Sequence, residues 1–162
     1  MKPKHTNRKL LLITIPLLIC WTLYIFNNSM QPSEDSNRQS SNALEAIENV
    51  VGQIDIEQGA KQTLIRKGAH VFEFAVLGIL LYFSAEQLSA RPKDGLIIAL
   101  LAGLLIASAD ETIQLLIPGR EGKITDVFID FAGVSAGTLA SLAAGFLWRR
   151  RAKPPRDCHK AC

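Results

Sequence analysis

Four stretches of the chain contain few charged residues, and each approaches the length that crosses a membrane as a helix. They span residues 10–26, 69–88, 95–117 and 127–148, and most Lys, Arg, Asp and Glu residues lie between them. A hydrocarbon core about 30 Å thick requires about 20 apolar residues in helical form. The pattern therefore predicts an all-α, polytopic membrane protein with four transmembrane helices.

A further helix is predicted between the first and second stretches. Residues 27–42 are rich in Ser, Asn and Gln, as expected for a hydrophilic tether. Beyond them, apolar side chains recur every three or four positions, which places them on one face of a helix. Such an outer amphipathic helix lies on the membrane surface or caps the bundle. The side chains of this face are Leu44, Ile47, Val50, Val51 and Ile54.

The first stretch follows a basic segment, so a cleaved signal peptide is the alternative to a first transmembrane helix. No pattern of small residues typical of a cleavage site follows the stretch, which favours an uncleaved helix. The chain then divides into a basic N-terminus with the first helix (1–26), an outer tether with the amphipathic helix (27–63), a three-helix core (64–148) and a basic tail (149–162).

Composition and charge add an orientation to this picture. The chain has 162 residues, of which 48% are apolar, and a net charge of +3. The clustering of the apolar residues excludes a disordered chain, a collagen-like chain and a disulfide scaffold. Four Lys and Arg residues stand among the first nine positions, and six stand in the tail. Because basic residues that flank membrane spans stay inside the cell, we expect both termini in the cytoplasm.

These basic runs do not indicate a nucleic-acid partner, because anionic membrane lipid accounts for charge beside spanning helices. The tail also contains Cys158, His159 and Cys162, which are too few ligands to predict a metal centre. We assign no metal and no cofactor from the sequence.

Polar residues inside the predicted spans gather near one end of the last three helices. Charged groups at this depth are costly, so each needs a partner or a purpose. At a helical rise of about 1.5 Å per residue, Glu73 lies roughly 9 Å into the second helix, Asp110 roughly 10 Å into the third and Asp130 about 6 Å into the fourth. The predicted topology brings all three to the outer side of the membrane. The expected cluster comprises Lys67, His70, Glu73, Asp110, Glu111, Gln114, Arg120, Asp126 and Asp130.

A purely structural role is the alternative, in which the charged residues pair only to orient the helices. Lys67 and Arg120 would then neutralise two of the five carboxylates, and we expect Arg120 to reach Asp126 or another of them. A network that only orients helices rarely needs so many unlike groups at one depth. We therefore favour a functional site.

The residues of this cluster carry a resemblance to a known family. Three blocks occur in order within residues 64–148: Arg66-Lys67-x-x-His70-x-x-Glu73-Phe74, then Asp110-Glu111-x-x-Gln114 with Arg120 after it, then Asp126-x-x-x-Asp130-x-x-Gly133-x-x-x-Gly137. In these blocks the chain resembles the VanZ-like family of bacterial membrane proteins. The resemblance implies a multi-pass protein of the cell membrane and a link to low-level resistance against the glycopeptide teicoplanin. It implies no particular reaction.

Three functions fit these residues. The first is an accessory or binding protein of the cell envelope, in which Lys67 and Arg120 hold the phosphate or carboxylate of a lipid-linked or amphiphilic ligand. Phe72 and Phe74 would lie beside its acyl chain. The second is a membrane-embedded enzyme acting on envelope lipids, in which His70 is a general base or shares a metal ion with nearby carboxylates. The carboxylates of that alternative are Glu73, Asp110 and Asp126.

The third function is a proton- or ion-coupled transporter with Glu73, Asp110 and Asp130 as its relay. Four helices are few for a transporter unless the chain forms a homodimer. The Gly133-x-x-x-Gly137 spacing permits close contact between two helices, either inside the bundle or between two copies. Packing inside the bundle is the interpretation that we favour for these glycines.

Overall fold

The computed structural model describes residues 8–52, 57–89, 91–120 and 122–151. Within them the chain forms helices and no strand: α1 (Arg8–Ser29), α2 (Ser33–Val51), α3 (Gln58–Leu88), α4 (Pro92–Leu115) and α5 (Ile124–Arg151). Four of these described helices, α1, α3, α4 and α5, are long and apolar enough to cross a membrane. The predicted fold class is confirmed.

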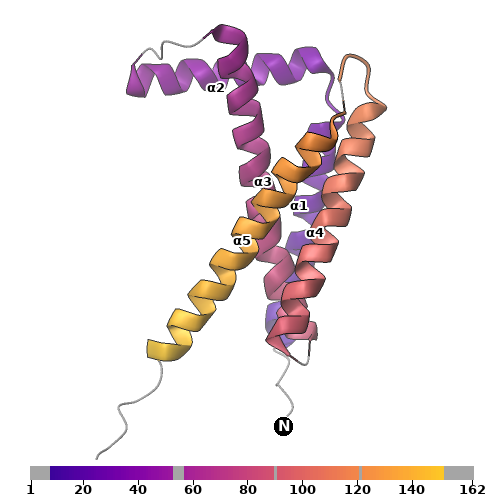
Figure 1. Cartoon of the computed structure of the whole chain (residues 1–162), viewed down its shortest axis with the longest axis vertical. Helices are drawn as coiled ribbons and strands as arrows, with labels where there is room; N and C mark the ends of the chain where they lie inside the picture. The colour runs from indigo at the N-terminus through magenta and orange to yellow at the C-terminus, as the bar shows by residue number, and fades with distance from the viewer. Residues whose placement is uncertain (1–7, 53–56, 90, 121, 152–162) are drawn as a thin grey trace, which may run out of the picture.

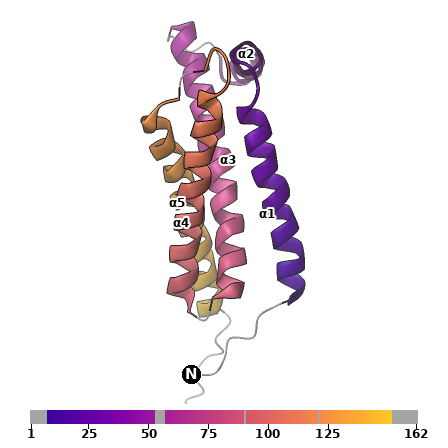
Figure 2. The same cartoon turned by 90° about the vertical axis from the view of Figure 1, so that its right-hand side faces the viewer.

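The four long helices alternate in direction, and α2 lies across one end of them. Helices α1 and α4 run toward the end that α2 covers, and α3 and α5 run away from it (Figure 1). In Figure 2, α2 is seen nearly end-on above the bundle. This arrangement collects the C-terminal ends of α1 and α4 and the N-terminal ends of α3 and α5 at one end. The predicted polar groups stand at these same helix ends.

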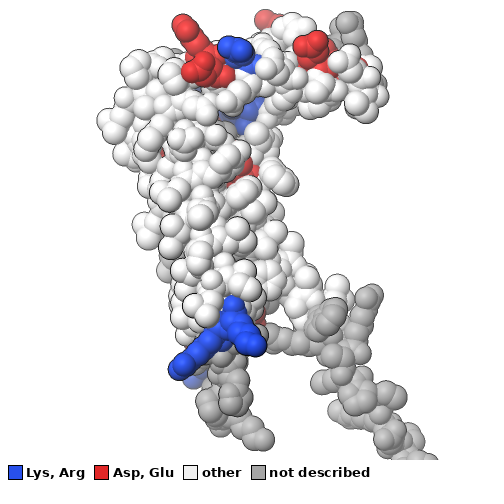
Figure 3. All heavy atoms as spheres, turned by 180° about the vertical axis from the view of Figure 1, so that it is seen from behind, with Lys and Arg blue, Asp and Glu red and all other residues white. Residues whose placement is uncertain are grey.

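Charged side chains gather mainly at the two ends of the molecule. Figure 3 shows a broad uncharged band between them on the face opposite to that of Figure 1. The band follows the long helices, whose exposed side chains are largely aliphatic or aromatic. An apolar belt between two polar ends is the surface that a bilayer requires.

Helix α2 begins at Ser33, within the segment for which we predicted a tether. Ser36, Ser40 and Leu44 recur every four residues and are all buried. The hydroxyl of Ser40 donates to the carbonyl of Ser36, so the buried serine is satisfied inside the helix. The polar segment is therefore helical because it packs one face on the bundle, where hydropathy alone predicts a tether.

The far end of α2 exposes part of the predicted apolar face. Ile47 and Val50 are 42% and 85% exposed, and Ile54 lies outside the described residues. An ion pair of 2.7 Å between Lys61 Nζ and Glu48 Oε1 joins this end of α2 to α3. Of the predicted apolar face, Leu44 is therefore buried and Ile47 and Val50 are exposed, while the side chain of Val51 lies outside what the structure describes.

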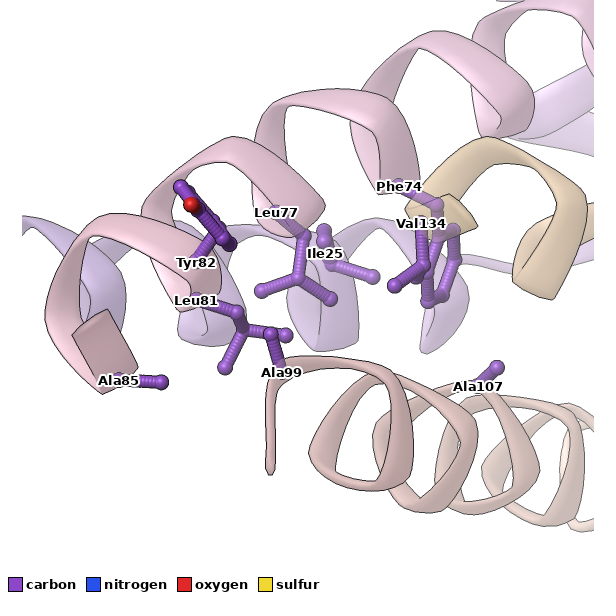
Figure 4. Packing of buried hydrophobic residues seen from close by; sticks show 9 residues of the cluster. All are labelled: Ile25, Phe74, Leu77, Leu81, Tyr82, Ala85, Ala99, Ala107 and Val134. Atoms are coloured by element: carbon purple, nitrogen blue, oxygen red, sulfur yellow. The ribbon is translucent and has the colours of Figure 1, made fainter. Parts of the chain in front are cut away.

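Helix α3 is the centre of the bundle, because it packs against each of the other described helices. Its closest neighbour is α5, where Gly133 and Gly137 lie directly against the backbone of α3 at Val71 and Ala75. The Gly133-x-x-x-Gly137 spacing therefore allows α5 to pack closely against α3 within the same chain. Beside this contact lies the buried core (Figure 4), which includes Ile25, Phe74, Leu77, Ala107 and Val134.

Candidate functional site

Two cavities lie beneath α2 at the end of the bundle where the polar groups gather. The first, which we term cavity A, is about 410 Å³ and lies among α3, α4, α5 and the start of α2. The second, cavity B, is about 440 Å³ and lies among α1, α2 and α3. Arg66, His70 and Arg120 line both cavities and form the wall between them.

The structure brings the nine predicted site residues to this end of the bundle, and eight of them line a cavity. Seven of them line cavity A: Lys67, His70, Glu111, Gln114, Arg120, Asp126 and Asp130. Glu73 lines cavity B, and Asp110 is fully buried within hydrogen-bond distance of Gln114. The depth estimate from helical rise therefore places these polar residues at one end of the bundle, but it does not identify their individual partners.

Helices α3 and α5 are connected by polar contacts across cavity A. Lys67 Nζ lies 2.6 Å from Asp126 Oδ1, and one turn further along each helix His70 Nδ1 lies 3.8 Å from Asp130 Oδ1. Lys67 is thus already neutralised by a carboxylate of the protein. This pairing weakens the prediction that Lys67 holds the anionic group of a ligand.

Among the described residues, Arg120 pairs with no carboxylate, so the expected ion pair with Asp126 or another of the carboxylates is wrong. Its guanidinium instead donates to the main-chain carbonyl of Asn28, at 3.4 Å, across the gap between the α4–α5 loop and α1. Burial lowers the pKa of Arg120, but a guanidinium is so strongly basic that the group stays charged at neutral pH. The guanidinium of Arg66 also forms no ion pair within the part of the chain that the structure describes.

Helix α1 contributes partners that the sequence analysis missed. Ser29 Oγ donates to Asp110 Oδ2 at 2.8 Å, and Asn28 Nδ2 donates to Glu73 Oε1 at 2.9 Å. The indole of Trp21 also donates to the carbonyl of Glu73, at 2.9 Å. Polar residues commonly follow a membrane span, so Asn28 and Ser29 carried no signal that distinguished them from an ordinary flank.

Two buried carboxylates of α4 have different surroundings. Asp110 Oδ2 accepts hydrogen bonds from Ser29 and Gln114, whereas its Oδ1 is buried without a hydrogen-bond partner in the described residues. Glu111 Oε1 accepts a hydrogen bond from the backbone N–H of Lys123, and this bond connects the end of α4 to the loop before α5. Glu111 therefore has a positioning role in the structure.

One group of three residues could hold a metal ion. One ligand atom each from His70, Asp110 and Asp130 lies within 4.8 Å of the others. This set differs from the one expected for a metal enzyme, because Glu73 and Asp126 are not part of it. Phe74 is likewise not beside a ligand chain: it is fully buried in the core, whereas Phe72 is exposed.

Comparison with known proteins supports the resemblance that the motifs carry. A family model described as VanZ/LLP1 matches residues 14–147. This match includes most of α1 and all of α2, which lie outside the blocks within residues 64–148 that first indicated the family. No curated protein and no solved structure matches the chain. Inclusion of α1 agrees with its hydrogen bonds to Glu73 and Asp110.

Proposed function

This chain belongs to the VanZ/LLP1 family, and we propose that it is an accessory binding protein of the cell envelope. In this proposal, cavities A and B hold the anionic headgroup of a lipid-linked or amphiphilic ligand. The observation that carries the proposal is the pair Arg66 and Arg120, which line both cavities without a carboxylate partner in the described residues.

Two guanidiniums at one wall suit a phosphate or carboxylate. A guanidinium donates in a planar fork that matches these groups, and such charge-assisted hydrogen bonds are about twice as strong as neutral ones. Lys67, which also lines cavity A, is less suitable because it is paired with Asp126. Arg66 therefore replaces Lys67 as the partner of Arg120 in the predicted anion site.

The size and position of the cavities also support a headgroup site. Volumes of about 410 and 440 Å³ fall within the range of about 300–1,000 Å³ that is typical of ligand sites. Close in sequence to the cavity residues His70 and Ile129, Phe72 on α3 and Phe128 on α5 are 65% and 66% exposed. A ligand with its headgroup in the cavities would leave its acyl chain beside these rings in lipid.

The orientation belongs to the same proposal. The basic residues before α1 and at the end of α5 favour the cytoplasm for that end of the bundle. The end covered by α2 then faces outward, toward the envelope. The site would take its ligand from the outer leaflet, where a glycopeptide or a lipid-linked precursor is accessible.

The test uses dodecyl phosphate as an anionic probe and dodecanol as a neutral probe with the same chain. Binding to the purified protein in neutral detergent is followed by native mass spectrometry and calorimetry. We expect saturable binding of dodecyl phosphate only. Because a hydrogen bond to a charged group contributes about 1.5–3 kcal/mol, Arg66→Gln or Arg120→Gln should weaken binding by about 10- to 100-fold.

Arg91→Gln is the matched control, because Arg91 is exposed and directly precedes α4, whose N-terminal end lies at the end of the bundle away from α2. It should bind dodecyl phosphate as the wild type does. Equal binding of dodecanol, or unchanged binding by Arg120→Gln, would overturn the proposal. The cellular readout is glycopeptide susceptibility, compared at equal levels of protein in the membrane.

A further inference from the structure

We propose that His70, Asp110 and Asp130 form a binding site for a divalent metal ion at the border of cavity A. Three different helices each supply one ligand, because His70 lies on α3, Asp110 on α4 and Asp130 on α5. One nitrogen and two carboxylate oxygens from these side chains all lie within 4.8 Å of one another. A single ion at their centre would reach all three after small side-chain rotations.

The first support for the site is that its atoms are buried and unsatisfied. Asp110 is 0% exposed and Asp130 is 2% exposed. His70 Nδ1 and Asp110 Oδ1 are both buried without a hydrogen-bond partner in the described residues. More than 90% of buried polar groups in proteins have a partner, so two orphaned atoms on residues of one such triad indicate a ligand.

Charge is the second support. The carboxylates of Asp110 and Asp130 repel each other strongly because they are close together and shielded from water. A divalent ion between them would neutralise both charges. The nearby cations do not serve this purpose: Lys67 pairs with Asp126, and Arg120 donates to the carbonyl of Asn28. Of the surrounding basic groups, only His70 comes within ion-pair distance of the two carboxylates, at 3.8 Å from Asp130 in the described part of the chain.

The hydrogen bonds around Asp110 are the third support. Ser29 and Gln114 both donate to its Oδ2 atom, at 2.8 and 2.9 Å. These bonds fix the carboxylate so that Oδ1 is the oxygen left for an ion. Outer-shell donors that orient a ligating carboxylate in this way are a regular feature of metal sites.

The donor set defines the class of metal. One imidazole and two carboxylates suit Zn²⁺ or Mn²⁺ better than Ca²⁺, which takes six to eight oxygen ligands. Three protein ligands would leave a coordination position open toward the cavity. An ion there would add positive charge beside Arg66 and Arg120, which line the same cavity. The metal site itself does not depend on the proposed amphiphile.

The test measures metal binding by the full-length protein in neutral detergent. Protein stripped with a chelator is equilibrated with Zn²⁺ or Mn²⁺, and binding is followed by calorimetry and elemental mass spectrometry. We expect one ion per chain. Loss of an outer-shell partner alone weakens metal sites by about 10- to 100-fold, so His70→Gln and Asp130→Asn should weaken binding by more than about 100-fold.

Asp94→Asn is the matched control, because it makes the same change on α4 at the opposite end of the bundle. It should bind the ion as the wild type does. In case the site variants do not fold, the wild type provides a second measurement: Zn²⁺ or Mn²⁺ should raise its thermal stability in a saturable manner.

Either of two results would overturn the metal site. One is a wild type that binds no ion and gains no stability from one. The other is a folded Asp130→Asn variant with wild-type affinity, which would leave His70 and Asp130 as a plain ion pair. The readout is the ion itself, so failure of this site and failure of dodecyl phosphate binding appear in separate measurements.

Discussion

The close contact between α3 and α5 can be tested by the substitution Gly137→Ala. A Cβ atom at Gly137 would lie 1.9 Å from the carbonyl oxygen of Ala75 and 2.8 Å from its carbonyl carbon. Real Cβ atoms essentially never come within 3.0 Å of such atoms. The added methyl group must therefore push the two helices apart at this level or distort one of them.

The cost can be estimated from the nature of the contact. Overpacking of a well-packed interior costs about 1–3 kcal/mol. We expect the upper end of this range, because the obstructing atoms belong to the helical backbone of α3 and cannot rotate away. For a chain of this length, about 3 kcal/mol corresponds to a fall in Tm of about 6–12 °C.

The assay is thermal unfolding of the purified protein in detergent, with Gly145→Ala as the control. Gly145 lies on the same helix, and a Cβ there would meet nothing within 4 Å. Alanine is the better helix former by about 1 kcal/mol, so this control should be as stable as the wild type or more stable. Equal Tm values for Gly137→Ala and Gly145→Ala would refute the close packing of α3 on α5.

Two further predictions concern the ion pair across cavity A and the orientation of the bundle. Lys67→Gln and Asp126→Asn should each lower the Tm, and a double-mutant cycle should give a coupling of only about 1 kcal/mol, because the two side chains are 35% and 29% exposed. Zero coupling would show that this pair does not join α3 to α5. Alkaline phosphatase fused after Cys162 should be inactive, and a fluorescent protein fused at the same place should fluoresce. An active phosphatase would show that the C-terminus lies outside the cell and that the proposed orientation is wrong.

Depth along a membrane helix is what the sequence predicts well. Apolar runs fix where the long helices lie, and a constant rise per residue fixes how far each polar group is from the end of its helix. That information places the polar groups of α3, α4 and α5 at one end of the bundle, and the structure then shows that Lys67 pairs with Asp126 and His70 with Asp130. The same information also predicted the four spans, with boundaries that differ by several residues at the start of α3.

The depth of a residue does not determine how its helix is rotated about its axis or which side chain becomes its partner. Arg120 lies at the expected end, but its partner is the carbonyl of Asn28, because the loop that carries it reaches toward α1. The helix around Ser36 and Ser40 was also missed, since its buried face consists of small hydroxyl side chains that hydropathy does not distinguish from a tether. Both errors concern contacts formed only after the helices have packed.

The glycines of α5 connect this packing to the chemistry of the site. Gly133 lies less than one turn beyond Asp130, and a Cβ there would come 2.6 Å from the carbonyl of Val71, the residue after His70. The absence of a side chain at Gly133 therefore lets α5 approach α3 at the level where His70 and Asp130 are 3.8 Å apart. Any side chain at Gly133 would increase the distance between His70 and Asp130. It would therefore also spread the ligands of the proposed metal site, which includes Asp110. The small residue in the apolar run thus contributes to the site as directly as the charged ones, because it determines how closely they can meet.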